Sequence, residues 1–173
     1  MAQPTLTFLG LPKTIKDLMQ MRGRMMDWSP IEDDIHKMLI HRQRELFKSR
    51  GQSEGVAWPD YSDEPKYSQL KQALVDRGKI SAMDLLRYKG GSAERLYPSL
   101  TKPRHPEHVW SLKGTEVRFG TKVPYAWKHD QGKGVNMFKE AIPQRRIGVL
   151  SDRNTERLKQ LIMLYIVRGK EGK

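Results

Sequence analysis

The sequence contains no cysteine, which excludes a disulfide scaffold and any metal site built from thiolates. It also lacks a long apolar run, because the longest covers only residues 161–167 and a bilayer-spanning helix needs about 20 such residues. The first residues, M-A-Q-P-T-L-T-F-L-G-L-P, have no basic start before a long apolar core, so no signal peptide is expected. These absences predict a soluble protein, and the missing cysteine is in keeping with a reducing cytosol.

What the sequence does contain is an unevenly distributed positive charge. The 173 residues include 32 Lys and Arg against 20 Asp and Glu, which gives a net charge of +12. Residues 1–84 hold 13 basic and 12 acidic side chains, whereas residues 85–173 hold 19 and 8. A basic half beside a neutral half favours a surface that meets a polyanion or an acidic partner, and a solvated basic surface is the alternative.

Apolar residues at helical spacing predict helices in both halves of the chain. The clearest helix covers residues 151–168, with Ser151 or Asp152 as its cap and Gly169 at its end. Its apolar stripe consists of Leu158, Leu161, Ile162, Tyr165 and Ile166. Further helical patterns cover residues 12–26, 29–50, 67–77 and 81–88.

The helix over residues 29–50 has the most complete end signals. Ser29 is a good N-cap, Pro30 suits the first helical position, and Glu32 completes a capping box. Gly51 is the expected stop. The residues expected on its apolar side are Ile31, Ile35, Met38, Leu39, Leu46 and Phe47.

Between these helices the pattern changes to the alternation that is typical of strands. Lys113-Gly114 fits a tight connection between two of them. The predicted strands cover residues 95–101, 108–112 and 115–120, and a further short strand is expected over residues 6–9. N-terminal helices, a small antiparallel sheet and a C-terminal helix packed on the sheet make an α+β fold.

The length and a hydrophobic share of 37% predict one domain over residues 1–173. Residues 51–66 are rich in Gly, Pro, Ser and acidic side chains, so a long loop anchored by Trp58 and Tyr61 is expected there. This loop and residues 1–28 are candidate arms between subunits.

Few residues suggest catalysis. His129-Asp130 is adjacent, as in metal-dependent phosphohydrolases, but such a site needs further His and Asp ligands. The pair His36 and His41 does not share a helix face well, and His105-Pro-Glu-His108 fits a loop leading into a strand. Gly132-Lys133-Gly134 lacks the remaining spacing of a phosphate-binding loop. The metal-hydrolase hypothesis therefore ranks last.

Basic and aromatic side chains alternate in the C-terminal half. Aromatic residues interleaved with cations can bind nucleic acid, but alternating aromatics in short strands more often fill a core. The cations are Arg118, Lys122, Lys128, Lys133, Lys139, Arg145 and Arg146, and the aromatics are Trp110, Phe119, Tyr125 and Trp127. No known nucleic-acid-binding motif is recognisable, so sequence-specific recognition is not expected.

Several short motifs follow one another in a fixed order. They are F-K-S-R-G and W-P, then R-L-Y-P-S-L-T, then V-R-F-G-T-K-V-P-Y-A-W-K-H-D-Q-G, then I-P-Q-R-R-I-G-V-L-S before the last helix. This order resembles the virion morphogenesis family of tailed phages, whose members are tail-completion or neck proteins. The match covers about residues 47–167. Asp130 is inserted between the family's His and Gln, and Arg146-Ile147 stands where a Pro-Phe pair is common.

The resemblance implies structural roles for the matching positions. In the family, a strand ending in Gly-Thr leads to a Pro-Tyr-Ala turn, a His-Gln-Gly-like segment and an Ile-Pro-x-Arg element. The matching residues are Trp58, Pro59, Leu96, Ser99, Gly120, Pro124, Tyr125, Ala126, His129, Gln131, Gly132, Pro143 and Arg145. We expect Gly120 to end its strand, and His129 and Gln131 to hold the following loop by hydrogen bonds. Arg145 is expected to be paired within or between subunits, and Arg146 to be exposed.

The resemblance also implies a function. The chain would be a structural virion protein rather than an enzyme, without cofactor or metal, that completes the tail or neck and joins the tail to the head. It would form a ring of six subunits after assembly in the host cytoplasm, with head-completion or connector and tail-terminator or tail-tube proteins as neighbours and no membrane. Genomic DNA or an acidic neighbour would meet Lys122, Lys128, Lys133, Lys139 and Arg146. The alternative is a non-specific DNA-binding protein that acts through its basic C-terminal half.

Overall fold

The computed structural model describes residues 11–59, 72, 76, 96–132 and 144–169. In this part of the chain, helices pack with a two-stranded antiparallel sheet, which confirms the predicted α+β class. The elements are α1 (Leu11–Met26), α2 (Glu32–Lys48), α4 (Leu96–Thr101), β1 (His108–Lys113), β2 (Glu116–Thr121), α5 (Ala126–Gln131) and α6 (Asp152–Arg168). The strand predicted over residues 6–9 and the helical patterns at 67–77 and 81–88 lie outside the described residues, except that residues 72 and 76 are helical.

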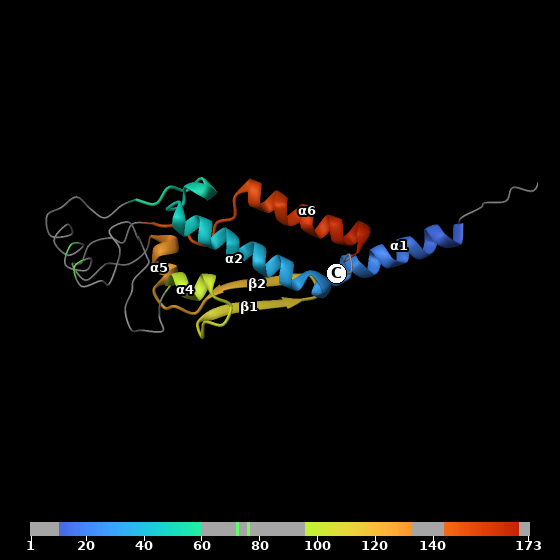
Figure 1. Cartoon of the computed structure of the whole chain (residues 1–173), viewed down its shortest axis with the longest axis horizontal. Helices are drawn as coiled ribbons and strands as arrows, with labels where there is room; N and C mark the ends of the chain where they lie inside the picture. Colours follow the sequence, from blue (N-terminus) through green and yellow to red (C-terminus); the bar gives the residue numbers. More distant parts are fainter. Residues whose placement is uncertain (1–10, 60–71, 73–75, 77–95, 133–143, 170–173) are drawn as a thin grey trace, which may run out of the picture.

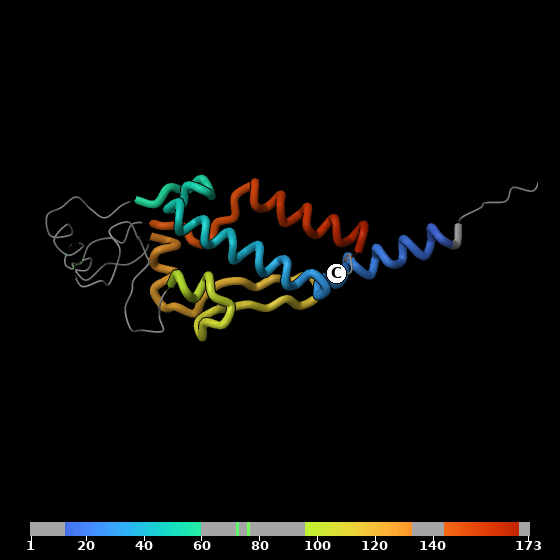
Figure 2. Tube along the Cα trace, in the orientation of Figure 1, coloured from blue at the N-terminus to red at the C-terminus, as the bar shows by residue number. Residues whose placement is uncertain are grey.

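The elements form an elongated molecule. Helices α2 and α6 lie beside the β1–β2 hairpin in the body, while α4 and α5 lie at one end of it (Figure 1). Helix α1 leaves the body at the opposite end, so that its length extends away from the hairpin (Figure 2). The helix continues through Gly23 to Met26, the end that the sequence pattern predicted. Five apolar residues of α1 are exposed, namely Ile15, Leu18, Met19, Met25 and Met26.

Helix α2 begins differently from the prediction. Residues Ser29–Ile31 form a 3-10 turn, and the α-helix begins at Glu32. The Oδ1 atom of Asp27 accepts hydrogen bonds from the Ser29 N–H (2.9 Å) and the Ser29 hydroxyl (2.6 Å). The Glu32 carboxylate instead accepts a hydrogen bond from the Trp110 indole N–H at 2.7 Å. The predicted Ser29 cap and capping box are therefore wrong, because an upstream carboxylate and a strand residue occupy these groups.

The end of α2 agrees with the prediction. The helix ends at Lys48, and the Gly51 N–H donates to the Leu46 carbonyl at 2.8 Å. Arg50 and Gly51 both have positive φ angles, of 50° and 85°. Gly51 adopts this left-handed conformation without the steric cost of a Cβ, which is why a glycine stops the helix here.

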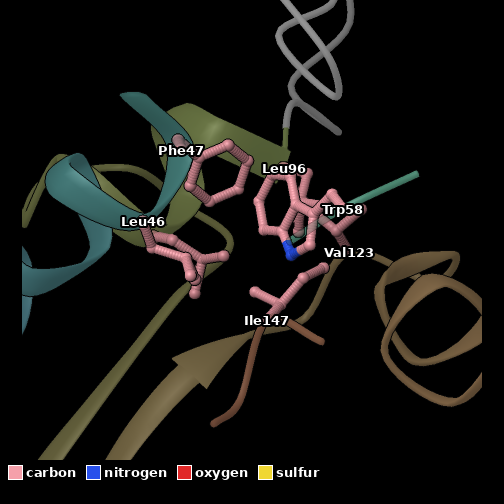
Figure 3. Packing of buried hydrophobic residues seen from close by; sticks show 7 residues of the cluster. Leu46, Phe47, Trp58, Leu96, Val123 and Ile147 are labelled. Atoms are coloured by element: carbon pink, nitrogen blue, oxygen red, sulfur yellow. The ribbon is translucent and has the colours of Figure 1, made fainter. Parts of the chain in front are cut away.

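One core cluster lies where α2, α4 and the segments flanking β2 and α6 meet. Its buried residues are Leu46, Phe47, Trp58, Leu96, Leu100, Val123 and Ile147. Figure 3 shows six of these labelled side chains converging from different parts of the chain. Trp58 is 6% exposed and packs edge-on against Phe47 at 5.2 Å between ring centroids. The prediction that Trp58 anchors the loop after α2 is confirmed, whereas Tyr61 lies outside the described residues.

A second core cluster joins α2 and α6 to the hairpin. Ile31, Ile35 and Tyr165 are buried at its centre. The half-buried side chains around them are Trp28, Leu39, Trp110, Leu112, Val117, Leu158, Leu161 and Ile162. The predicted apolar stripe of the C-terminal helix thus packs on α2 and on one face of the sheet, as expected for a helix with apolar residues every three to four positions.

The hairpin was predicted correctly, but the segment before it was not. Strands β1 and β2 pair antiparallel with Trp110 opposite Phe119, and Gly114 in the connection has a φ of 57°. Residues 96–101, expected as a strand, form α4 instead. Pro98 lies in the first turn of this helix, where its missing N–H is not needed. The Ser99 hydroxyl donates to the Leu96 carbonyl at 2.8 Å, which further supports the helical turn.

Helix α6 is linked to α1 through one long side chain. The helix has the predicted ends, with the Ser151 hydroxyl oxygen accepting the Asn154 N–H at 3.4 Å and Gly169 at its C-cap. At that C-terminal end, the Arg24 guanidinium donates to the carbonyls of Ile166 (2.8 Å) and Val167 (3.1 Å). A cation at the end where carbonyls lack helical partners stabilises the helix, so Arg24 fixes the end of α1 against α6.

Candidate functional site around helix α5

The motif from Gly120 to Gly132 covers the end of β2, the turn after it and helix α5. The Thr121 hydroxyl shares a hydrogen bond with the Ser99 hydroxyl (2.7 Å) and accepts the Val123 N–H (3.1 Å). Pro124 follows in the turn before α5, where its restricted φ suits the start of a helix. Gly120 is not the end of the strand, since β2 continues to Thr121 and a Cβ on Gly120 would meet open space. The strand thus ends at Thr121, one residue after the expected Gly120.

The Tyr125 side chain connects α5 to α4. Its hydroxyl oxygen accepts the Leu96 N–H at 3.3 Å, which satisfies a backbone donor at the start of α4. Tyr125 and Ala126 both pack against the first core cluster. The Pro-Tyr-Ala turn therefore has the architectural role that the sequence predicted.

Asp130 holds the segment that leads into α6. Its Oδ1 atom accepts the N–H groups of Ile147 (2.7 Å) and Gly148 (2.8 Å). His129 and Gln131 were expected to hold the following loop by hydrogen bonds, but Gln131 is exposed and residues 133–143 of that loop lie outside the described residues. His129 contributes through its backbone carbonyl, which accepts the Arg145 N–H at 2.7 Å. Asp130, the residue that has no counterpart in the motif pattern, therefore makes the main side-chain contact with the segment before α6.

The His129 side chain lies in a half-buried site beside a cation. Its ring packs edge-on against Tyr125 at 6.0 Å. Its Nδ1 atom is buried and has no hydrogen-bond partner among the described residues. Burial, together with the nearby positive charge of Arg145, lowers the pKa of His129 from 6.5 to about 4. The imidazole is consequently neutral at pH 7.

This shift predicts a pH-dependent stability. Below about pH 6.5 the unfolded chain takes up a proton at His129 that the folded chain accepts only near pH 4, so the stabilising contribution is lost as the pH falls through this window. The loss in free energy of unfolding should reach about 3 kcal/mol. Urea titrations of the wild type and His129→Gln between pH 7 and pH 4 test it. His41→Gln, at an exposed position, is the matched control. Parallel curves for the wild type and His129→Gln would contradict the prediction.

The two arginines before α6 have different environments. Arg145 is 5% exposed, and its Nε–H donates to the Pro59 carbonyl at 3.3 Å. The Arg146 side chain is exposed, while its carbonyl accepts the Trp58 indole N–H at 3.2 Å. Arg146 is exposed as expected, and Arg145 is paired within the chain, which is one of the two arrangements expected for it. Pro143 lies outside the described residues.

We expect Arg145→Ala to lower the free energy of unfolding by about 1–3 kcal/mol, because buried hydrogen bonds from a charged group and the packing of its stem are lost. Arg146→Ala should change it by less than about 0.5 kcal/mol, since an exposed side chain is removed. Chemical denaturation of both variants measures the difference. Equal effects, or a larger effect at Arg146, would show that the environments do not determine the roles of the two residues.

A buried ion pair next to α5 escaped the sequence analysis. The Arg42 and Glu54 side chains, 5% and 0% exposed, meet at 3.0 Å. Glu54 also accepts the Ser151 N–H and the Asn154 amide at 2.6 Å each. Burial by itself raises the pKa of Glu54, but the hydrogen bonds from Ser151 and the charge of Arg42 outweigh it, and the net shift is downward. Only a lone Glu in a polar loop marks this site in the sequence.

A groove of about 420 Å³ opens beside this ion pair, between α2, β2, α5 and the start of α6. Its walls are mainly apolar, and the exposed Trp127 contributes to them. Two buried polar atoms of lining residues, Arg42 Nη2 and Gln43 Oε1, have no hydrogen-bond partner within the described part of the chain. The sequence pattern gave no sign of this groove, because its lining comes from segments far apart in the chain.

Two histidines pair between helix α2 and the start of strand β1. The Nε2 atoms of His36 and His108 are 2.9 Å apart, and His108 Nδ1 donates to the Ser99 carbonyl at 2.6 Å. The ring centroids are 5.1 Å apart, so the rings meet head-on in an N–H···N hydrogen bond. His36 also stacks on Trp110 at 4.2 Å. Among the described residues, no three His, Cys, Asp or Glu side chains gather as a metal site would require.

The basic and aromatic residues of the C-terminal half differ in burial. Trp110, Phe119 and Tyr125 pack against the core clusters, and only Trp127 among the four predicted aromatics is largely exposed, at 52%. Of the candidate cations, Lys122 and Arg146 are exposed and Lys128 is half-buried, whereas Lys133 and Lys139 lie outside the described residues. The interpretation of the hairpin aromatics as core residues is confirmed.

Comparison with protein-family models, with curated proteins and with solved structures finds no match to the chain. None of the helices that the structure describes is both long and apolar enough to cross a membrane.

Proposed function

We propose that the chain is a structural subunit of a closed homo-oligomeric ring that completes the tail or neck of a tailed-phage virion and joins the tail to the head. The order of motifs supports the choice of family. The observation that carries the proposal is the exposed apolar side of α1, a helix that extends beyond the body of its own chain (Figure 1).

The direction of this apolar side is the important point. At 100° per residue, Ile15, Leu18 and Met19 fall on one side of the helix and Arg24 falls on the opposite side. Arg24 is the residue that contacts α6. In its last turn α1 therefore faces its own chain with Arg24 on its polar side, and the exposed apolar residues lie on the opposite side, as expected of a surface that another subunit covers.

The motif residues support an architectural rather than a catalytic role. Trp58 and Leu96 belong to the first core cluster, and Ser99 is buried beside it. The Oδ1 atom of Asp130, of the kind that binds metals in phosphohydrolases, accepts two backbone N–H groups. In the proposed ring of six, the exposed Lys122 and Arg146 face genomic DNA in the lumen or an acidic neighbouring protein, such as a connector or a tail-tube subunit.

Two measurements test the proposal. Analytical ultracentrifugation of the purified protein should give one closed oligomer at micromolar concentration. Antibody labelling of purified particles in electron micrographs should place the protein at the head–tail joint. Absence of the protein from mature virions would overturn the proposal.

The basic half also favours an alternative, a DNA-binding protein that acts outside the particle. Residues 85–173 hold 19 basic and 8 acidic side chains. Binding through phosphates weakens steeply with salt because counterions are released. Submicromolar binding of the monomer to duplex DNA at physiological salt would favour this alternative over the ring, and micromolar or weaker binding would count against it.

A further inference from the structure

The described part of the chain leaves apolar side chains open in several places, including Met163, Leu164 and Val167 on α6, and two of these surfaces suit each other. One is the outward side of α1, with Ile15, Leu18 and Met19 exposed by 45%, 59% and 69%. The other is the groove between α2, β2, α5 and α6, with Trp127 in its wall. We infer that the groove of each copy receives helix α1 of the next copy, an inference that rests on the proposed ring.

The occupant of the groove cannot be the chain's own α1. Arg24 fixes the C-terminal end of α1 to the carbonyls at the end of α6. From this point α1 runs away from the body, whereas α5 and the groove beside it lie toward the opposite end (Figure 1). A helix held in this direction reaches only the groove of another copy.

The two surfaces match in shape. An amphipathic helix that binds a groove uses apolar anchors at positions i, i+3 and i+4, often with a fourth contact at i+7. Ile15, Leu18 and Met19 have this spacing, and Arg22 occupies the i+7 position. The groove volume of about 420 Å³ lies within the range of sites that enclose several apolar groups.

The charges match as well. Arg42 and Asp130 are the charged residues in the lining of the groove. Arg42 is neutralised by Glu54, so that Asp130 leaves a net negative charge. Arg22 is the one cation on the apolar side of α1 and is exposed. With α1 seated, the Arg22 guanidinium lies near the Asp130 carboxylate.

The contact is head-to-tail, because it joins different surfaces on the two copies. Each copy then has one helix to donate and one groove to fill, and such heterologous contacts close into a ring when the rotation between copies permits. A symmetric α1–α1 pair would give a dimer instead. The two arrangements predict different cross-links.

Because the chain has no cysteine, disulfide cross-linking reports only on introduced positions. The test mixes separately purified full-length Leu18→Cys and Gly148→Cys proteins under mild oxidation. Gly148 lies in the groove lining, and a Cβ there meets Asp130 Oδ1 at an ordinary 3.5 Å. The matched control replaces Leu18→Cys with Asp17→Cys, an exposed neighbour on the other side of α1. We expect at least tenfold more cross-linked dimer from the Leu18→Cys mixture than from the control.

Leu18→Glu gives a second reading that does not depend on oxidation. It should raise the dissociation constant of the oligomer more than tenfold while leaving the melting temperature of the dilute protein unchanged, since this side chain is exposed. Asp17→Lys is its control. A closed oligomer without the Leu18→Cys to Gly148→Cys cross-link, or one in which Leu18→Cys links to itself, would overturn this inference alone. A chain that stays monomeric at every concentration would overturn the proposed ring together with it.

Discussion

Replacing Glu54 with alanine is expected to lower the free energy of unfolding by about 3–5 kcal/mol, the usual cost of removing one partner of a buried ion pair. The substitution leaves the Arg42 guanidinium in a site where its side chain is 5% exposed. It also leaves the Ser151 N–H and the Asn154 amide without the carboxylate that accepts them at 2.6 Å. The loop after α2 and the start of α6 would then lose their shared contact.

The chain offers an exposed ion pair as a control. Glu116 and Arg118 meet at 2.8 Å with side chains 61% and 70% exposed, and such a pair contributes about 0–1 kcal/mol. Glu116→Ala should therefore change little. Because the pKa of Glu54 is lowered in the folded chain, its stabilising effect is present above about pH 4.3 and shrinks as the pH falls further. Similar urea midpoints for Glu54→Ala and Glu116→Ala at pH 7 would contradict this account.

Gly51→Ala is expected to destabilise the protein by about 3 kcal/mol or more, through two effects that add. A non-glycine residue at a φ of 85° costs about 1–2 kcal/mol. A Cβ at this position would also overlap the Val56 carbonyl oxygen and lie 2.7 Å from Trp58 Cδ1. Overpacking of this kind costs typically 1–3 kcal/mol, and here it displaces the tryptophan that closes the first core cluster.

Gly55→Ala separates these two effects. Gly55 has a φ of 71°, but a Cβ there meets nothing within 4 Å. Its substitution should therefore cost only the backbone term, about 1 kcal/mol. Thermal or chemical unfolding of both variants gives the comparison, and a cost at Gly55 equal to that at Gly51 would show that the contact with Trp58 is unimportant.

The sequence predicted the elements with clear periodicity and end signals. The C-terminal helix, the hairpin and the stop at Gly51 were found because each depends on neighbouring residues alone. Residues 96–101 were misassigned because six residues fit a strand and a helix almost equally well. The helix is favoured because it places both Leu96 and Leu100 in the first core cluster from one side.

The candidate site was predicted less well, because its main contacts join distant segments. Arg42 is held on the buried side of α2 by Glu54 and by the Ile147 carbonyl, both outside the helix. His36 pairs with His108 from 72 residues away. Ser29 has the composition of an N-cap, yet Asp27 takes its N–H group. The residue types in the sequence show which side chains can form hydrogen bonds, whereas tertiary packing decides which of them come into contact.

The hydrogen bonds between Arg24 and the end of α6 can form only late in biosynthesis. They join residues up to 143 positions apart, and chains emerge from the ribosome at about 5–20 residues per second. The carbonyls that hold Arg24 therefore appear on the order of ten seconds after α1 does. Until then nothing in α6 sets the direction of α1, so a nascent chain does not yet present this helix as the finished protein does. If α1 joins neighbouring copies as proposed, the chain becomes competent for assembly only after α6 has been made.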